Sequence, residues 1–378
     1  MRPDAVVVGA GIAGVSAALE LARRGVRVTV IDRGPVSGGT TGLGEGNVLC
    51  SDKRPGPELA LALAGAALYD ELEASFPGAA RVRRKGGLIL YEGDGIWPDA
   101  PAFAQRMARA GVECELLDAA GLRALEPAVA RDLAGALHFP ADLQVAPREL
   151  TRALADEVRR LGGTVREGVA ARRITASAAA VTGVETDSGT IECGTVVLAA
   201  GPWSAPLARS AGLRLPVEPR KGTLVQTGPA PGLVRRKLYE AAYVADVTSE
   251  EAGLRIAAVI EETLDGHVLC GSSRERAGFD ALVDEGTCDA IVARCARFVP
   301  ALATMTRRLA WCGFRPYLPD HLPAIGPSGE VPGLHVSTGH EGAGIGLAPI
   351  SGRLVAQALC GELTDVPLAP FSPDRFAG

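Results

Sequence analysis

The segment Val6–Asp32 contains residues whose types and spacing suit the binding of a nucleotide. Gly9, Gly11 and Gly14 form a Gly-x-Gly-x-x-Gly motif, and Asp32 follows it at the spacing expected of a dinucleotide fingerprint. Glycines at these places permit a tight turn, close approach of the backbone to a pyrophosphate and close packing of a helix on a strand. The start of that helix favours phosphate charge, and the acid can bind ribose hydroxyls. The segment therefore predicts a bound dinucleotide, and the motif alone fits both NAD and FAD.

Two charged residues are candidates for binding a substrate. Arg315 has a planar guanidinium that can make two parallel hydrogen bonds to a carboxylate and that stays charged. The alternative is an arginine that binds local carbonyl groups. Glu45 can select a cationic substrate by its opposite charge, and the alternative is an exposed loop carboxylate. Only a family resemblance, carried by motifs elsewhere in the chain, singles out these two among the charged residues.

The glycine motif needs a strand before it and a helix after it, and the sequence has both. Ala5–Val8 is a short apolar run, and Ile12–Arg24 has apolar residues at helical spacing before Gly25. Val26–Ile31 is typical of a buried strand. These segments predict a β-α-β unit at the N-terminus.

The rest of the chain alternates between helical and strand patterns. Helices are predicted over Glu58–Ala74, Pro101–Ala110, Asp118–Glu126, Pro147–Leu161 and Cys288–Phe298. Strands are predicted over Gly87–Tyr91, Thr164–Glu167, Ala171–Ile174, Val181–Thr186, Thr190–Glu192, Thr195–Ala200, Thr223–Thr227, Ala241–Val247, Arg255–Ile260 and His267–Cys270. A glycine-rich strand, turn and helix occupy Leu334–Leu359.

This alternation favours an α/β protein in which a nucleotide domain is assembled from separated pieces. We assign residues 1–83, 145–215 and 305–378 to that domain. Residues 84–144 and 216–304 are assigned to a substrate domain with a mixed sheet and helices.

The composition is that of a globular protein, with 47% hydrophobic and 22% charged residues among 378. A net charge of -5 gives no electrostatic reason to expect nucleic acid or an anionic membrane as a partner. No apolar stretch is long enough for a transmembrane segment, and Met1 is followed almost directly by an apolar strand. We therefore expect a cytoplasmic protein. The eight cysteines form no Cys-x-x-Cys pair, so free buried thiols are expected rather than a metal site.

Several further motifs point to one family. The segments in question are Gly39–Asn47, Asp142–Pro147, Val196–Ser204, Arg315–Gly326 and Gly339–Pro349. Together with the N-terminal fingerprint they make almost the whole chain resemble the D-amino-acid oxidase superfamily of FAD enzymes. The resemblance is greatest to the branch of glycine oxidase, D-amino-acid dehydrogenase and sarcosine oxidase.

The resemblance implies an FAD-binding Rossmann-like (GR2-type) domain and a mixed-sheet α+β substrate domain. Monomeric sarcosine oxidases attach their flavin through a cysteine, and the matching place here is Gly313, beside Cys312, so non-covalent FAD is expected. The residues implied to hold FAD are Gly9, Gly11, Ile12, Ala13, Gly14, Asp32, Arg33, Thr40, Thr41, Gly46, Asn47, Ala171, Ala200, Gly201, Trp203, Arg315, His340, Glu341, Gly342, Ala343, Gly344, Ile345, Gly346 and Leu347.

The implied reaction is oxidation of the C–N bond of a small amine or amino acid. A hydride would pass from Cα to flavin N5, and the imine would be hydrolysed. Arg315 would anchor the carboxylate, and Tyr243 would lie over the flavin from a strand, or else be a half-buried aromatic residue of a sheet. His340 is either a flavin contact or an ordinary turn histidine. A lysine that the family uses with oxygen has no counterpart in Gly266–Gly271, so the electron acceptor stays open.

Two other functions remain open on the sequence. The chain can be the FAD-carrying β-type subunit of a hetero-oligomeric amine, opine or hydroxyproline dehydrogenase. It can also be an NAD-dependent dehydrogenase that uses the same fingerprint. Homo- and hetero-oligomers are both compatible with the sequence.

Overall fold

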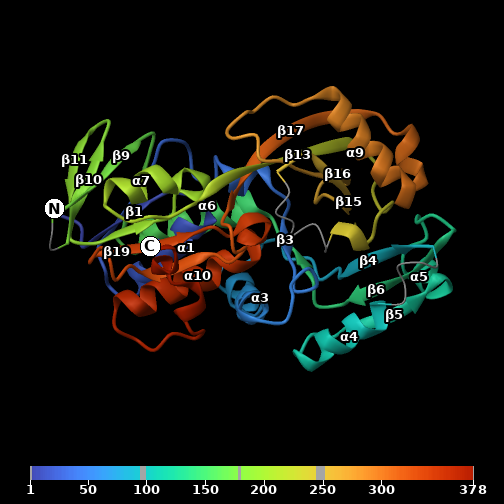
Figure 1. Ribbon diagram of the computed structural model, residues 1–378, viewed down its shortest axis with the longest axis horizontal. Helices are drawn as coiled ribbons and strands as arrows, with labels where there is room; N and C mark the ends of the chain where they lie inside the picture. Colours follow the sequence, from blue (N-terminus) through green and yellow to red (C-terminus); the bar gives the residue numbers. More distant parts are fainter. Residues whose placement is uncertain (1, 94–98, 178–179, 244–251, 378) are drawn as a thin grey trace.

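The N-terminal β-α-β unit forms the middle of a six-stranded sheet. The computed structural model describes residues 2–93, 99–177, 180–243 and 252–377. The sheet has the order β18-β19-β12-β1-β2-β8, and all its pairs are parallel except β18 with β19. Its strands are β1 (Ala5–Val8), β2 (Val28–Asp32), β8 (Thr164–Glu167), β12 (Val196–Leu198), β18 (Ala324–Pro327) and β19 (Leu334–Thr338). Both termini lie in this part of the molecule (Figure 1).

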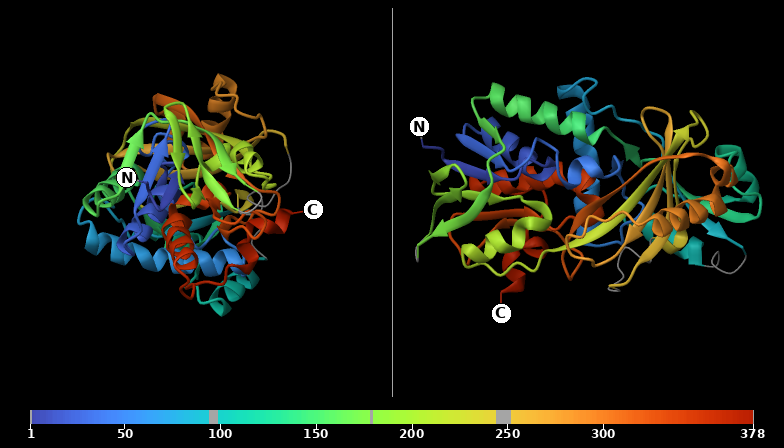
Figure 2. Two further views of the ribbon diagram at one scale, coloured as in Figure 1. Left: turned by 90° about the vertical axis from the view of Figure 1, so that its left-hand side faces the viewer. Right: turned by 90° about the horizontal axis from the view of Figure 1, so that it is seen from above.

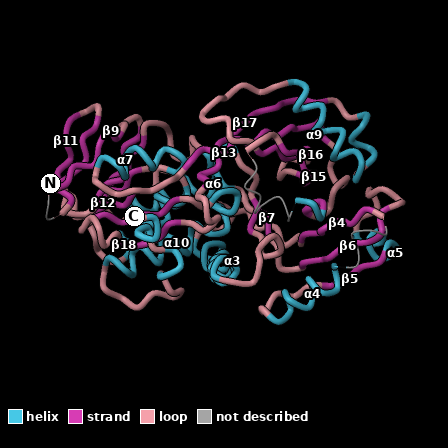
Figure 3. The backbone as a smooth tube through the Cα atoms, viewed as in Figure 1, coloured by secondary structure: helices cyan, strands magenta, loops and turns pink. Residues whose placement is uncertain are grey.

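Helices α1 (Ile12–Arg23), α3 (Pro57–Ser75), α6 (Pro147–Arg160) and α10 (Gly344–Leu359) form a layer beside this sheet. Helix α1 contacts both α10 and α6. Helix α10 also contacts α3, and these two helices are labelled in Figure 3. Two glycines permit these close crossings. A Cβ atom at Gly352 would lie 2.6 Å from the backbone nitrogen of Ala17, and one at Gly65 would lie 2.3 Å from the carbonyl oxygen of Gly346. Since real Cβ atoms are not found so near a backbone, larger residues would push the helices apart.

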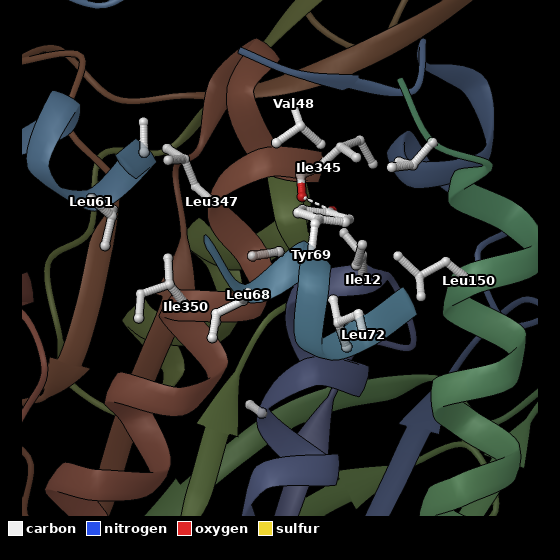
Figure 4. Packing of buried hydrophobic residues seen from close by; sticks show 14 of the residues in the cluster. Ile12, Val48, Leu61, Leu68, Tyr69, Leu72, Leu150, Ile345, Leu347 and Ile350 are labelled. Atoms are coloured by element: carbon white, nitrogen blue, oxygen red, sulfur yellow. Dashed lines mark hydrogen bonds between the residues drawn. The ribbon is translucent and has the colours of Figure 1, made fainter. Parts of the chain in front are cut away.

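The start of α10 is joined to α3 by a side chain that replaces a missing backbone hydrogen bond. Pro349 lies inside α10 and has no N–H, so it cannot donate to the carbonyl of Ile345 four residues earlier. The hydroxyl of Tyr69 donates to that carbonyl at 2.5 Å (Figure 4). Around this bond, Leu68 and Leu72 from α3 and Ile350 from α10 belong to one buried apolar cluster.

A three-stranded antiparallel sheet and helix α7 complete the nucleotide-binding part. The strands are β9 (Ala171–Ala176), β10 (Val181–Thr186) and β11 (Gly189–Glu192), and α7 covers Ser204–Ser210. Ile174 and Val184 from this small sheet pack in one cluster with Val6 and Leu198 of the large one.

The second large sheet has eight strands in the order β17-β13-β16-β15-β14-β4-β6-β5. Only β14 and β4 are parallel, and every other pair is antiparallel. The strands are β4 (Gly87–Glu92), β5 (Glu115–Asp118), β6 (Leu133–Phe139), β13 (Glu218–Pro229), β14 (Lys237–Glu240), β15 (Arg255–Glu262), β16 (His267–Arg274) and β17 (Arg307–Tyr317). Helices α4 (Ala100–Arg109), α5 (Ala119–Leu125) and α9 (Glu285–Phe298) pack against it. Figure 2 shows the two large sheets side by side along the long axis of the molecule.

The remaining elements of the described chain are short. They are α2 (Thr40–Leu43), β3 (Asn47–Val48), β7 (Leu143–Gln144) and the 3-10 turns Gly201–Trp203, Pro300–Thr304, Glu341–Ala343, Ala369–Phe371 and Pro373–Phe376. Strands β3 and β7 pair with each other, which brings the residue-40s loop to the segment before α6.

Most predicted helices and strands are present within a residue or two, but one prediction is wrong. Residues 241–243, which we expected to begin a strand over Ala241–Val247, are helical, and residues 244–247 lie outside the described part. The ring of Tyr239, in β14, is 5.8 Å from that of Tyr243, whereas residues four apart along a strand lie about 13 Å apart. Contact between these two rings is compatible with the turn and not with continued strand geometry.

The proposed division into domains needs one change. Strand β17 pairs with β13 along its length and so belongs to the eight-stranded sheet, although we had placed residues 305–378 in the nucleotide domain. We now propose that the boundary follows Tyr317.

No helix of the described residues is long and apolar enough to cross a membrane.

Candidate active site

A cavity of about 650 Å³ lies at the carboxyl ends of the parallel strands, where the six-stranded sheet faces the eight-stranded one. Ligands bind at this edge in open α/β sheets. The lining extends from Asp32 and Arg33 to Tyr243 and Arg315, and so includes residues from both large sheets and the loops between them. Of the residues that we predicted to bind cofactor or substrate, all line this cavity except Gly14 and Gly46.

The turn after β1 can be made only by glycine. Gly9 has a φ of +116°, and a Cβ atom there would lie 2.3 Å from the carbonyl oxygen of Ala199. A Cβ atom at Gly14 would lie 1.9 Å from the carbonyl oxygen of Gly9, so Gly14 packs the helix against the turn, as predicted, and does not face the cavity. The backbone N–H of Ile12, at the start of α1, donates to Oγ1 of Thr41 at 3.1 Å.

Asp32 lies at the end of β2 and fixes the backbone around it. Its Oδ2 accepts the N–H of Ala10 at 2.7 Å, and its Oδ1 accepts the N–H of Gly34 at 2.8 Å. A carboxylate has about four acceptor positions, so capacity for hydroxyl groups remains. Beside it, the guanidinium of Arg33 lies 4.0 Å from the centre of the Trp203 ring, and both residues line the cavity.

The loop after β2 is tied to the second sheet. Oγ1 of Thr40 donates to the carbonyl oxygen of Phe314 at 2.7 Å, and Trp311 donates to the carbonyl oxygen of Leu43 at 2.8 Å. A Cβ atom at Gly46 would lie 1.9 Å from the carbonyl oxygen of Val145. Gly46 therefore allows two backbones to touch and does not line the cavity.

The N-terminus of α10 faces the cavity with little side-chain cover. The first N–H groups of a helix have no intrahelical acceptor and carry positive partial charge. Here they belong to Gly344, Ile345 and Gly346, which all line the cavity. Such groups can stabilise negative charge on a bound ring or phosphate.

His340 holds this turn in place. Its Nε2 lies 3.0 Å from Oγ of Ser351, and that hydroxyl donates its hydrogen to the carbonyl oxygen of Leu347 at 2.7 Å. Nε2 must therefore carry the proton and donate to Ser351. Burial lowers the pKa of His340 to about 4, so the ring is neutral at pH 7. His340 thus lines the cavity and anchors the backbone of the turn, and its contact with a flavin stays a prediction.

Arg315 lies across a glycine on the neighbouring strand. It pairs with Arg220 in register, and its guanidinium covers Gly222, where a Cβ atom would lie 2.0 Å from Nη1. Nη1 donates to the carbonyl oxygen of Ser273 at 3.1 Å. Burial and the charge of Arg274 lower the pKa of Arg315, but an arginine stays protonated in proteins. The remaining donors of the guanidinium are available to a ligand.

Glu45 is not an exposed loop carboxylate. Only 13% of its side chain is exposed, and Oε2 accepts hydrogen bonds from Asn47 at 2.6 Å and from Lys237 at 2.8 Å. Oε1 is buried without a hydrogen-bond partner among the described residues. Burial opposes the charge of Lys237, but Glu261 and Glu45 outweigh it and raise its pKa. Glu45 thus brings a paired carboxylate to the cavity wall.

A second buried ion pair stands beside the helix N-terminus. Arg220, 1% exposed, donates to Oε1 of Glu341 at 2.5 Å, and His321 lies 3.3 Å from the other oxygen. Burial opposes ionisation of Glu341. The hydrogen bond to His321 and the charges of Arg274 and Arg220 outweigh it and lower the pKa of Glu341 to about 2. This pair fixes Glu341, whose φ of +46° is unusual for a residue with a side chain.

Sequence reasoning missed several charged residues at or near the cavity. They are Lys53, Arg220, Lys237, Arg274 and Glu261. Lys53 lines the cavity, is 3% exposed and lies 2.5 Å from Asp52. Only Arg220 had a signal in the sequence, since its Pro-x-Lys-Gly segment resembles a turn of the family, although here the segment belongs to β13. The others are charges within ordinary strand and loop patterns, where nothing marks them as buried.

The comparisons with known proteins agree with this geometry. A family model described as FAD dependent oxidoreductase matches residues 4–358. The chain belongs to the FAD-dependent oxidoreductase family. Its relatives include subunit HcnC of hydrogen cyanide synthase from Pseudomonas aeruginosa, 30% identical over 420 residues that cover 99% of this chain and 96% of that protein.

Two solved structures of the family have the same overall fold. Glycine oxidase from Geobacillus kaustophilus superposes with a TM-score of 0.90 at 28% identity and covers 100% of both chains. Iminodiacetate oxidase (IdaA) from Chelativorans sp. superposes with a TM-score of 0.82 at 26% identity and covers 98% of each.

The family identifies the cofactor as FAD, held without a covalent bond, and not as NAD. The residues present fit such a cofactor. The glycine turn leaves room for a pyrophosphate that a Cβ atom would fill, and the start of α10 supplies unpaired N–H groups further along the same cavity. Gly313 lines the cavity without a side chain to react, while Sγ of Cys312 contacts the carbonyl oxygen of Ala281 at 3.4 Å.

Proposed function

We propose that this protein oxidises the C–N bond of a small amine that carries a carboxylate. The observation that carries the proposal is the position of Arg315. Its guanidinium lies over Gly222 in the wall of the same cavity that contains the start of α10. A carboxylate held by that guanidinium would place the adjoining carbon near the site for the flavin ring.

We propose that FAD is held along the whole cavity. Asp32 and Arg33 would take the ribose and adenine end together with Ala171, while the glycine turn and the start of α1 would take the pyrophosphate. The isoalloxazine ring would lie between the residue-40s loop and the start of α10. The wider set of residues proposed to contact FAD is Gly9, Gly11, Ile12, Ala13, Asp32, Arg33, Thr40, Thr41, Asn47, Ala171, Ala200, Gly201, Trp203 and His340 to Leu347.

Bound FAD supplies the hydride acceptor, N5 of its ring. The residues of the chain orient the donor. Arg315 would fix the carboxylate, and the free Oε1 of Glu45 would accept a hydrogen bond from the amine. Leu43, Leu49 and Leu224 line the cavity and would exclude water from the reacting carbon. The amine must be neutral before its carbon can release a hydride, and water then hydrolyses the imine to the carbonyl product and free amine.

The relatives support an amine with a carboxylate. Glycine oxidase and iminodiacetate oxidase are named for substrates that contain both groups. Both structures cover nearly the whole of this chain, so the likeness includes the substrate-facing sheet as well as the nucleotide fold.

The test is a substitution of Arg315 by Gln. Loss of a bidentate charged contact is expected to raise KM for the amino acid about 100-fold, since such contacts contribute a few kcal/mol. The substrate is found first by mixing the holoenzyme anaerobically with candidate amines and following bleaching of the flavin band.

Arg308→Gln is the matched control, because Arg308 is an exposed arginine on the same strand. It should leave KM unchanged. An Arg315→Gln variant that binds FAD and keeps the KM of the natural protein would disprove the carboxylate role. Absence of bleaching by any amine would reject the reaction class itself.

A second candidate function follows from HcnC, which is named as a subunit of a synthase. We propose as the alternative that this chain also acts with partner chains that receive its electrons. In that case the isolated holoenzyme would be reduced by its amine but would not turn over with oxygen. Steady turnover of the isolated chain with oxygen would exclude the alternative.

A further inference from the structure

A second arginine lies buried near Arg315, and no carboxylate of the described residues forms a salt bridge with it. Arg274, at the end of β16, is 6% exposed. Its Nε and Nη1 have no hydrogen-bond partner among the described residues. The guanidinium carbon lies 4.4 Å from the centre of the Tyr243 ring, and Tyr243 lines the cavity. Burying a charge without enough hydrogen bonds costs free energy, so we expect an anionic or hydrogen-bond-accepting group to bind this guanidinium.

The strand register places Arg274 on the cavity side of the sheet. Lys221 and Glu275 exchange two backbone hydrogen bonds, at 3.0 and 3.1 Å, and their side chains pair at 3.3 Å. Side chains alternate between the faces of a strand. The next residues on each strand, Gly222 and Arg274, therefore share the other face. That is the face on which the guanidinium of Arg315 covers Gly222.

The other charges near this end of the cavity are already paired. Glu341 accepts from Arg220, Glu45 accepts from Lys237, and Lys53 lies against Asp52. No salt bridge to Arg274 or Arg315 exists within the described ranges. Burial and the charge of Arg274 also lower the pKa of Arg315, and the nearby Glu341 and Glu45, each paired with another cation, do not outweigh them.

We propose that Arg274 binds a second carboxylate, so that the substrate is an amine carrying two carboxylates, one held by each arginine. This inference rests on the proposed function. With its amine neutral, as hydride release requires, such a substrate has two negative charges and complements the two unpaired arginines. A substrate with a single carboxylate would leave one of the two buried guanidinium groups without an anionic partner.

Two kinds of compound have this chemistry. In an amino dicarboxylic acid both carboxylates belong to one carbon chain, and in an N-carboxyalkyl amino acid they lie on either side of the nitrogen. Anaerobic bleaching with aspartate and glutamate of both chiralities, and separately with iminodiacetate, distinguishes them.

The binding test uses ligands that cannot be oxidised at a C–N bond. Diglycolate has two carboxylates around an ether oxygen, and methoxyacetate is its counterpart with one. Each is titrated into the holoenzyme while the flavin absorption spectrum is followed. Diglycolate is expected to bind about 10- to 100-fold more tightly, the range for a hydrogen-bonded charged contact. Equal affinity would overturn the proposal without any variant.

Arg274→Gln should remove the preference for diglycolate and change methoxyacetate binding less than about threefold. Arg274→Lys keeps the charge, should retain part of the preference, and serves if the glutamine variant loses FAD. Arg276→Gln is the matched control, since Arg276 is a nearby arginine that already stacks on Tyr317 and donates to its hydroxyl at 2.6 Å. Preference retained in folded Arg274→Gln, or lost equally in Arg276→Gln, would overturn the inference.

The two hypotheses fail in different ways. Failure of the proposed function would appear as a wild-type flavin that responds to neither ligand and is bleached by no amine. Failure of the inference alone would leave methoxyacetate binding dependent on Arg315, with no gain from the second carboxylate.

Discussion

Asp142 is a buried carboxyl behind the cavity wall. Its Oδ1 accepts the N–H of Cys50 at 3.0 Å, and its Oδ2 accepts the hydroxyl of Ser51, which also contacts the hydroxyl of Tyr239. Burial raises the pKa of Asp142 to about 7, and the hydrogen bonds from Ser51 and Cys50 only partly offset it. Asp142 is therefore partly protonated near neutral pH.

This raised pKa predicts a pH dependence of stability. The pKa of this carboxyl is 3.8 in the unfolded chain and about 7 in the folded protein, so the folded state holds the proton more tightly. The stability that this proton gives to the folded state is fully present below pH 3.8 and is lost as pH rises through 7. Asp142→Asn cannot ionise. Between these pH values the free energy of unfolding of the wild type should fall by roughly 4 kcal/mol relative to the variant.

Denaturant unfolding of both proteins at a series of pH values measures this difference. Buried His335 and His340, with pKa values of about 4, destabilise both proteins as pH falls, so their effect cancels. Asp156→Asn, at a side chain that is 73% exposed, is the control. Parallel curves for the wild type and Asp142→Asn would contradict the assignment.

The single residues divide clearly into those that the sequence could identify and those that it could not. Gly9 and Asp32 were identifiable because a local turn and its spacing define them. Arg274 was not, because its importance comes from its place opposite a partner strand and from two guanidinium nitrogens that are buried without a hydrogen-bond partner among the described residues. Glu45 was recognised as a candidate, but its pairing with Lys237 was not, because the two residues are 192 positions apart in the sequence.

The junction of α3 with α10 depends on the bond from Tyr69 to the carbonyl of Ile345. Tyr69→Phe removes the donor and leaves a buried carbonyl that Pro349 cannot satisfy. The expected cost is about 1–3 kcal/mol of unfolding free energy, because an unpaired buried polar group keeps its full desolvation penalty. Chemical denaturation of the holoenzyme measures it.

A second substitution supplies the matched comparison. Pro349→Ala gives back an N–H to the carbonyl of Ile345, so Tyr69→Phe should cost less in the Pro349→Ala background than in the wild type. Additive effects of the two substitutions would show that the hydroxyl does not replace the missing backbone donor.

The long helices and the N-terminal unit were predictable because their periodicity and end signals are local. Pro147 opens α6, and Asp118 caps α5 by accepting the N–H of Gly121 at 2.7 Å. Strand β6 was missed, although it lies between β4 and β5 in the second sheet. Its sequence, Leu-Ala-Gly-Ala-Leu-His-Phe, has weak strand propensity, and only its two neighbours in the sheet make it a strand.

The cavity lies between both large sheets, so a ligand that fills it should stabilise the protein as one unit. FAD-free protein should gain roughly 2.7 kcal/mol when FAD is present at about 100 times its Kd. Calorimetry of FAD-free protein at increasing FAD concentration should show the melting temperature rising throughout.

FMN is the control ligand, because it lacks the adenine half that Asp32 and Arg33 are proposed to hold. At equal concentration it should raise the melting temperature less than FAD does. Equal shifts would contradict the position proposed for the adenine end.

The arrangement of the whole chain was predicted in outline and not in detail. Separated segments did combine into one nucleotide sheet, as the alternation of strand and helix patterns suggested. The order of strands in the second sheet could not be read from the sequence, because antiparallel pairing depends on cross-strand contacts. Thus β14 pairs in parallel with β4, from a part of the chain about 150 residues earlier.

The order of strands in the first sheet has a consequence for biosynthesis. Strand β1 emerges first from the ribosome, yet one of its neighbours, β12, follows only after residue 195, and β19 and α10 come near the end of the chain. The apolar strands Ala5–Val8 and Val28–Asp32 must therefore wait unpaired on one side until β12 and β8 have been made, about half-way through translation. FAD cannot help during that time, since the last wall of its cradle has not been made. Nascent chains of this protein should depend on chaperones until synthesis is almost complete.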